Sequence, residues 1–210
     1  MKPSSFLLSF LSGLILVALA GCFSLGQGDA QPTLYYTLEP VDASPVSTPD
    51  SASPIVVGLD RIEVPSYLDR REIVVRTGDN ELRYTERHLW AERPSDSLQR
   101  LLSMNIKRQA SMAVEVHGLP WPDHSNPDWV LQLNLESFEG QESPGTELLL
   151  EASWTIQSTA DGSIAKQGHY RAVNLDWSKG DYSSLARGLS KGLEDLGRLI
   201  AKDLEASQAN

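Results

Sequence analysis

The amino-acid sequence predicts a single α+β domain in which two main helices pack on a mostly antiparallel sheet. Two stretches, 129–136 and 148–157, alternate between apolar and polar residues, as half-buried strands do. A later stretch, from about Asp181 to Ala206, places apolar residues three or four positions apart, which is typical of an amphipathic helix. Its apolar stripe consists of Leu185, Leu189, Leu193, Leu196, Ile200 and Leu204. Strands followed by a covering helix favour the α+β class.

The first half of the chain carries four further strand patterns. Leu34–Leu38 is dense in β-forming residues, and Ile55–Val64 alternates with a change of phase that suggests a bulge or burial on both faces. Pro65 ends this second strand because proline cannot donate to a ladder. Glu72–Thr77 and Glu81–Thr85, joined across Gly78-Asp79-Asn80, predict a hairpin.

The remaining elements are a helix and the last strand of a meander. Ser95 follows a proline and is expected to be the helix N-cap. The apolar face of this helix consists of Leu98, Leu101, Leu102, Ile106 and Ala110. Gly118–Pro127 is expected to be a loop, and Ile164–Leu175 is expected to complete an antiparallel meander with the two alternating strands.

The N-terminus predicts an exported, lipid-anchored protein. Lys2 precedes an apolar run, Phe6–Ala20, which is shorter than the roughly 20 residues that a membrane-spanning helix needs. The run ends in Leu-Ala-Gly-Cys, the pattern of bacterial lipoprotein precursors. We therefore expect signal peptidase to cleave between Gly21 and Cys22, and Cys22 to carry a diacylglycerol and an N-acyl chain such as palmitate. The alternative is an ordinary secretory peptide, but Cys22 is the only cysteine and has no disulfide partner.

Cleavage there sets the expected domain boundaries: a signal peptide at 1–21, a lipidated tether at 22–33, a domain at 34–206 and a tail at 207–210. Removing 21 of 210 residues leaves 189, enough for one domain with its own core. The loss of Lys2 changes the net charge from −10 to −11. A chain this acidic is a poor candidate for nucleic acid or anionic headgroups, so we expect it to contact the membrane through its lipids alone. Phe23, rather than an aspartate, follows the lipidated cysteine and implies sorting to the outer membrane.

The sequence offers no recognisable catalytic or metal site. The histidines form neither of the helical zinc motifs, and there is no Gly-x-Ser-x-Gly elbow or phosphate-binding Gly-Lys-Ser/Thr. His117, Asp123 and His124 share one loop and are expected to be solvated. We therefore expect no catalytic residues, no metal and no cofactor beyond the covalent lipid. Paired carboxylates in a periplasmic hydrolase stay an alternative.

Five residues near the middle of the chain are candidates for docking a partner: Tyr67, Leu68, Asp69, Arg70 and Trp90. Tyrosine, tryptophan and arginine are the residue types that binding hot spots favour. The competing interpretation is that Tyr67, Leu68 and Trp90 cap the core while Asp69 and Arg70 form a local pair. In the last helix, three glycines offer close-approach sites for a second helix or another copy: Gly188, Gly192 and Gly197.

Taken together, these motifs resemble the ABC-type transport auxiliary lipoprotein component family, the PqiC-like (paraquat-inducible protein C-like) lipoproteins. The most specific run is Ile62–Arg70, and the other matching features are the lipobox at Cys22, Leu34–Leu38, Ile73–Arg76, Leu82, Trp90-Ala91-Glu92, the strand with Trp154 and the leucine-rich last helix. The long loop Glu39–Pro54 is where we expect a departure from the family.

The resemblance implies a non-enzymatic lipoprotein on the periplasmic side of the outer membrane. Its partners would be an ABC transporter and an MCE-domain protein that together move lipids between the membranes and support membrane integrity. A homo-oligomer is compatible with this role, and nucleic acid is not an expected partner. The runner-up interpretation is a periplasmic carrier that holds a lipid in its own cavity.

Overall fold

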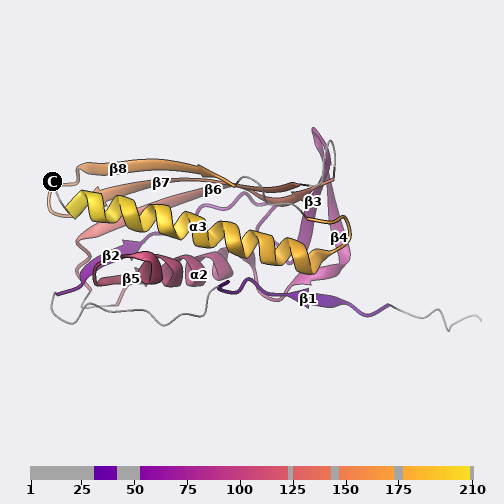
Figure 1. The fold of residues 1–210 in the computed structure, drawn as a ribbon, viewed down its shortest axis with the longest axis horizontal. Helices are drawn as coiled ribbons and strands as arrows, with labels where there is room; N and C mark the ends of the chain where they lie inside the picture. Colours follow the sequence, from indigo (N-terminus) through magenta and orange to yellow (C-terminus); the bar gives the residue numbers. More distant parts are fainter. Residues whose placement is uncertain (1–30, 42–52, 123–124, 143–146, 173–176, 209–210) are drawn as a thin grey trace, which may run out of the picture. The chain divides into compact units, whose positions relative to one another are not determined.

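Ten elements make up the fold in the computed structural model, which describes residues 31–41, 53–122, 125–142, 147–172 and 177–208. In chain order they are β1 (Leu34–Tyr36), β2 (Ile55–Leu59), β3 (Glu72–Gly78), β4 (Glu81–Trp90), α2 (Pro94–Gln109), β5 (Val114–Gly118), β6 (Trp129–Gln141), β7 (Glu147–Ser158), β8 (Ile164–Arg171) and α3 (Tyr182–Gln208). All ten lie in the second of the two units into which the chain divides, Thr33–Asn210. The α+β class with two main helices is therefore confirmed for this unit (Figure 1).

The eight described strands form one mixed sheet, so the expectation of a mostly antiparallel sheet is wrong. The predicted meander β6–β7–β8 and the hairpin β3–β4 are antiparallel. Four of the seven strand pairings in the described part of the chain are parallel, namely β1–β4, β2–β5, β2–β6 and β3–β6. Short turns join only antiparallel neighbours, whereas parallel ones need long crossovers. The sequence pattern indicates where the short turns lie, but it does not indicate which distant strands pair with each other.

Strand β6 runs the length of the sheet, and two different strands pair along one of its edges. β7 pairs along its other edge from Trp129 to Gln141. β2 lies beside the first residues of β6 and β3 beside its last, with a single bridge between Glu63 and Asn134 in the middle. The predicted strand Ile55–Val64 accordingly ends at Leu59, where its phase changes. The chain between β2 and β3 is left to form the turn described below.

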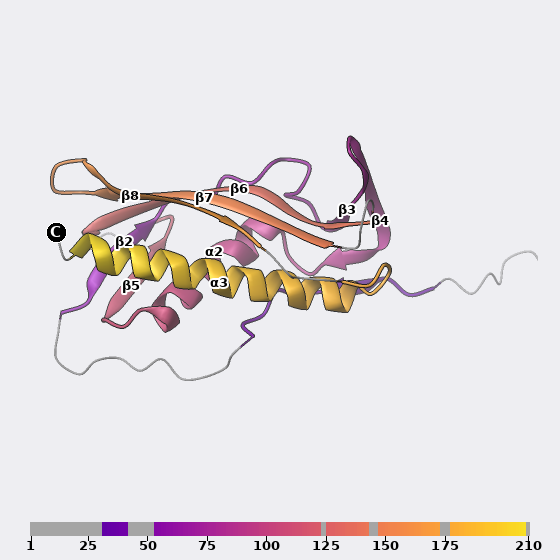
Figure 2. The same ribbon diagram turned by 45° about the horizontal axis from the view of Figure 1, so that its top comes forward.

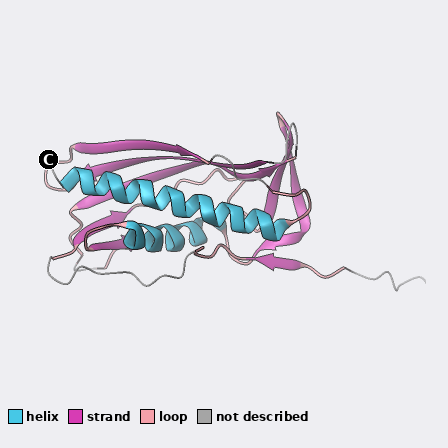
Figure 3. Ribbon diagram, viewed as in Figure 1, coloured by secondary structure: helices cyan, strands magenta, loops and turns pink. Residues whose placement is uncertain are grey.

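Both helices cover one face of the sheet (Figures 1 and 3). The six predicted stripe residues of α3 are completely buried, as are the four leucine and isoleucine residues of the α2 face. Gly197 lies where the helices cross, since a Cβ there would be 2.7 Å from the Cβ of Asn105 in α2. The second helix expected at this glycine is therefore α2 of the same chain. Gly188 instead faces Leu148 of β7.

Three local predictions need correction. The N-cap of α2 is Arg93, and Pro94 occupies the first helical position, so Ser95 is not the cap. β5 was not expected, because its five residues are too short to show a clear period beside the loop. The last strand of the meander ends at Arg171, and residues 173–175 of the predicted strand lie outside the described residues.

Candidate functional site

The segment between β2 and β3 closes into a tight turn that carries four of the five predicted docking residues. The backbone N–H groups of Leu68 and Asp69 both donate to the carbonyl of Pro65, at 2.8 and 3.1 Å. The N–H of Arg70 donates to the carbonyl of Leu68 at 2.8 Å. Pro65, which cannot continue a ladder, thus provides the acceptor around which the chain reverses.

Two of the five residues belong to the core. Leu68 is 2% exposed and Trp90 is 4% exposed, and the Trp90 ring lies 6.0 Å from the Phe138 ring. The interpretation that these side chains cap the core therefore holds for both. Docking by the five residues stays a prediction, and only the more exposed members could contact a partner directly.

Asp69 is committed to the start of α2. Its Oδ1 accepts a hydrogen bond from the Ser95 N–H at 3.1 Å, and its Oδ2 lies 3.8 Å from Nη1 of Arg93. Arg93 has no side-chain cap of its own, so the turn supplies an acceptor from 26 residues earlier to one of the unpaired amides of the helix. Instead of the expected local pair with Arg70, Asp69 contacts Ser95 and Arg93.

Replacing Asp69 with alanine should lower the free energy of unfolding by about 1 kcal/mol, because an amide of α2 loses its acceptor. Asp69→Asn keeps the acceptor oxygen and should cost less than the alanine variant. Urea denaturation of the purified domain measures both. Equal losses of stability in Asp69→Ala and Asp69→Asn would show that the negative charge of Asp69, rather than its capping hydrogen bond, stabilises the domain. Arg93→Ala is the control and should change stability by less than about 1 kcal/mol, since that pair is long and largely exposed.

Arg70 lies at the surface between two partners. Its Nε donates to Oε2 of Glu72 at 2.9 Å, and its guanidinium carbon lies 3.9 Å from the centre of the Tyr84 ring. The hydrogen bond from Arg70 lowers the pKa of Glu72. We call Arg70, Glu72 and Tyr84 the turn patch. Tyr84 was missed as a site residue, because its position in a predicted hairpin strand does not indicate which face it occupies.

Tyr67 lies half-buried beside a buried ion pair that the sequence did not reveal. Nη2 of Arg76 lies 2.7 Å from Oε1 of Glu139, whose side chain is completely buried. Burial first, and then the charge of Glu139, raise the pKa of Tyr67. Glu139 follows Phe138 after an irregularity in the β6–β7 register, and both side chains are buried. An alternating pattern would have placed one of them in solvent.

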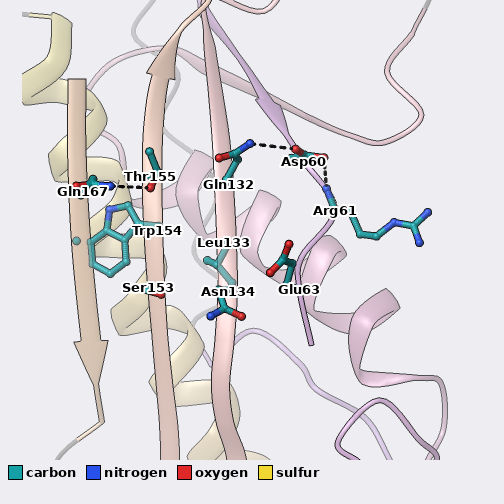
Figure 4. A pocket seen from close by; sticks show the side chains of 11 residues that line it. Asp60, Arg61, Glu63, Gln132, Leu133, Asn134, Ser153, Trp154, Thr155 and Gln167 are labelled. Atoms are coloured by element: carbon teal, nitrogen blue, oxygen red, sulfur yellow. Dashed lines mark hydrogen bonds between the residues drawn. The ribbon is translucent and has the colours of Figure 1, made fainter. Parts of the chain in front are cut away.

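A polar hollow of about 480 Å³ lies on the sheet between the segment after β2 and strand β8 (Figure 4). Figure 4 shows Nε2 of Gln132 directed at Asp60, and Nε2 of Gln167 directed at Thr155, at 3.5 and 3.4 Å. Two pairs of lining side chains thus hydrogen-bond to each other. The hollow therefore presents amides, hydroxyls and carboxylates without an evident reacting pair.

The hydrolase alternative can be tested on one cluster near this hollow. The hydroxyl of Ser153 donates to Oε1 of Glu136 at 2.8 Å, and Nε2 of His169 lies 3.6 Å from Oε2 of the same glutamate. A nucleophilic serine needs the histidine next to its hydroxyl, with the carboxylate behind the histidine. Here the carboxylate occupies the middle position. This cluster therefore does not activate Ser153 as a nucleophile.

The described residues contain neither a candidate metal-binding cluster nor a candidate membrane-spanning helix. Within them, no group of three or more His, Cys, Asp or Glu side chains could hold a metal ion. His117 lies 3.4 Å from Glu115, while Asp123 and His124 are outside the described part. No helix there is long and apolar enough to cross a membrane. Gly21 and Cys22, the predicted cleavage and lipidation site, also lie outside the described residues.

Comparison with known proteins shows that the chain matches the model of one protein family. Residues 36–201 match the model of the family described as ABC-type transport auxiliary lipoprotein component. The match runs from the end of β1 almost to the end of α3 and so covers most of the chain. No curated protein matches this sequence.

Solved structures share the fold. A crystal structure of a protein described only as uncharacterized has a TM-score of 0.65 at 18% identity, over 83% of this chain and 99% of its own. A protein from Xanthomonas campestris also reaches 0.65, at 14% identity, over 80% of this chain and 93% of its own. A PelC dodecamer from Paraburkholderia phytofirmans has a TM-score of 0.38 at 16% identity, over 72% and 95% of the two chains. At these identities the likeness of the first two concerns the fold alone.

Proposed function

The chain belongs to the ABC-type transport auxiliary lipoprotein component family, and from this we propose that it is a non-enzymatic lipoprotein subunit of an ABC/MCE-type system that transports lipids between membranes. The observation that carries the proposal is the family match over residues 36–201. In this role the domain positions other components and supports the integrity of the envelope.

The proposed location follows from the N-terminal motif. Cys22 carries the lipids, residues 1–21 are removed, and residues 22–33 form the tether to the domain. A single acyl chain binds the bilayer only reversibly, and each buried methylene contributes about 0.8 kcal/mol to binding. Three acyl chains together would therefore hold the protein on the bilayer essentially permanently. Phe23 directs the protein to the outer membrane, where the domain faces the periplasm.

We propose that the turn patch contacts the MCE-domain partner. Arg70 and Tyr84 stack at 3.9 Å, so a partner would meet a guanidinium and a ring already held in one arrangement. Arginine and tyrosine are the residue types most enriched at binding hot spots. Leu68 and Trp90 support this patch from inside, because they fix the turn and the end of β4 against the core.

Deleting the gene should make the envelope more sensitive to detergents, and a photo-crosslinking residue in place of Tyr84 should capture an MCE-domain protein in living cells. The same crosslinker in place of Ala160, in the exposed turn after β7, is the matched control and should capture none. Detergent growth assays and mass spectrometry of the crosslinked products provide the measurements. Unchanged permeability together with no MCE-domain protein in either product would overturn the proposed function.

A further inference from the structure

A groove of about 450 Å³ separates the start of the domain from the N-terminal half of α3. Tyr35, Pro40 and Val41 line one wall, and Ser183 and Arg187 line the other. We call these five residues the tether groove. Figures 1 and 2 show β1 and the chain after it running beside this half of α3.

The walls of the tether groove are held by contacts that do not depend on any ligand. The hydroxyl of Tyr36 lies 2.7 Å from Nδ1 of His88, and the His88 ring stacks on Tyr182 of α3 with the ring centres 4.1 Å apart. The two walls are also joined directly, because the N–H of Glu39 donates to Oγ of Ser190 in α3 at 3.2 Å. β1 is thereby fixed to both β4 and α3, so the groove is preformed.

The tether groove exposes apolar and cationic side chains. Leu34, Tyr35 and Val41 are three of the seven large hydrophobic side chains that are exposed in the described part of the chain, at 47%, 58% and 47%. Arg187 is exposed and makes no ion pair or hydrogen bond within the described residues. Exposed apolar and aromatic groups beside a free cation are typical of surfaces that meet a membrane interface.

A second arginine strengthens the cationic character of this surface. The guanidinium of Arg71 lies 5.5 Å from the centre of the Tyr35 ring and donates to the carbonyls of Trp90 and Ala91. In the groove lining itself the charged residues are Arg187 and Glu39, and Arg71 adds a second guanidinium beside Tyr35.

The tether sets how far the groove can lie from the membrane. Leu34 follows Cys22 by 12 residues. An extended chain spans at most about 3.6 Å per residue, so Leu34, next to the groove, can lie no farther than about 43 Å from the lipidated cysteine. This step rests on the proposed lipid anchor. The phosphates of the anchoring bilayer can therefore lie within reach of the groove.

We propose that the tether groove docks on anionic phospholipid headgroups of the membrane that anchors the protein. Arg187 and Arg71 contact the phosphates, and Tyr35, Val41 and the neighbouring Leu34 lie among the upper parts of the acyl chains. The domain then has a defined orientation on the bilayer and does not rotate freely on its tether. The proposal departs from the initial expectation that the chain is a poor candidate for anionic headgroups and contacts the membrane through its lipids alone.

An environment-sensitive fluorophore at Ser183→Cys tests the proposal in the mature lipoprotein. Lipidation consumes Cys22, so the new cysteine is the single reactive thiol. On vesicles of phosphatidylethanolamine and phosphatidylglycerol, the emission should shift to the blue. Arg187→Gln should reduce the ratio of membrane-contacting to free domains about fivefold, since one basic residue at an anionic surface contributes about 1 kcal/mol. Tyr35→Ser should also reduce it, and higher salt should weaken the contact.

Four controls separate the sources of the signal. The same fluorophore at Ala160→Cys, in the turn after β7, should remain in water, and Lys202→Gln, which removes a charge from the far half of α3, should leave the Ser183 signal unchanged. Vesicles of phosphatidylcholine should give no shift, and added inorganic phosphate should not alter it. A fluorophore at Ser183 that stays in water on anionic vesicles, or that responds equally to Arg187→Gln and Lys202→Gln, would overturn the proposal.

The unsubstituted lipoprotein distinguishes this failure from failure of the anchor. It should not react with the thiol reagent. A reactive Cys22 would show that the lipid anchor is absent, and would remove both the anchor and the groove proposal. An unreactive Cys22 with no response at Ser183 would remove the groove alone.

Discussion

Replacing Trp90 with alanine should lower the free energy of unfolding by about 3–5 kcal/mol, because a large ring that is 4% exposed would leave a cavity beside Phe138. The melting temperature should fall on the order of 10 °C for a domain of this size. Trp90→Phe keeps much of the packing and should lose less. Urea denaturation followed by circular dichroism measures the three proteins.

The result decides between the two interpretations of this residue. Tyr35→Ser is the matched control, because Tyr35 is an exposed aromatic residue on the neighbouring strand, and surface substitutions usually change stability by less than about 0.5 kcal/mol. If Trp90→Ala left stability intact but abolished capture of the partner at Tyr84, Trp90 would be a docking residue rather than a core residue.

Arg76→Met should destabilise the domain by about 3–5 kcal/mol, since it leaves the buried carboxylate of Glu139 without its partner. Both Nε and Nη2 of Arg76 donate to the same oxygen of Glu139, at 3.1 and 2.7 Å. The other oxygen accepts from the N–H of Phe138 at 2.8 Å, which cannot replace a countercharge. Equilibrium denaturation of the variant provides the measurement.

Two comparisons make this second prediction specific. The double variant Arg76→Met with Glu139→Leu removes both charges and should recover part of the loss, because a pair of apolar side chains can replace a buried ion pair. Arg70→Met breaks an exposed pair with Glu72 and should cost no more than about 1 kcal/mol. A double variant less stable than Arg76→Met would contradict the idea that the unpaired charge causes the loss.

Much of the fold could be predicted from local patterns. The alternation in β6 and β7 and the stripe of α3 indicate which side of each element faces the core, and those side chains are buried as expected, except that Trp129 is only partly buried. The turn at Asp79-Asn80 places the hairpin correctly between β3 and β4. The parallel neighbours of β6 could not be predicted, because β2 and β3 reach it only through contacts between distant parts of the chain.

The candidate site was predicted less completely. The residue types of the turn indicated an unusual segment, but not which of its side chains would be exposed. Leu68 and Trp90 are buried, and Asp69 caps α2. Arg70 remains at the surface because Glu72 and Tyr84 hold it there. The tether groove was not expected at all, since its two walls are about 150 residues apart in the chain.

The sequence by itself determined the predicted lipidation motif at Cys22, the domain that follows it, and the inward face of the main helices and strands. These features depend on short-range order, because an apolar run or a period of 2 or 3.6 residues is visible within one segment. Only the tertiary structure decided the mixed order of the sheet, the burial of Glu139 with Arg76, and the capping of α2 by Asp69. Each of these joins residues that lie far apart in the chain, and such a pairing is fixed by packing and hydrogen bonding across the whole domain rather than by any local pattern.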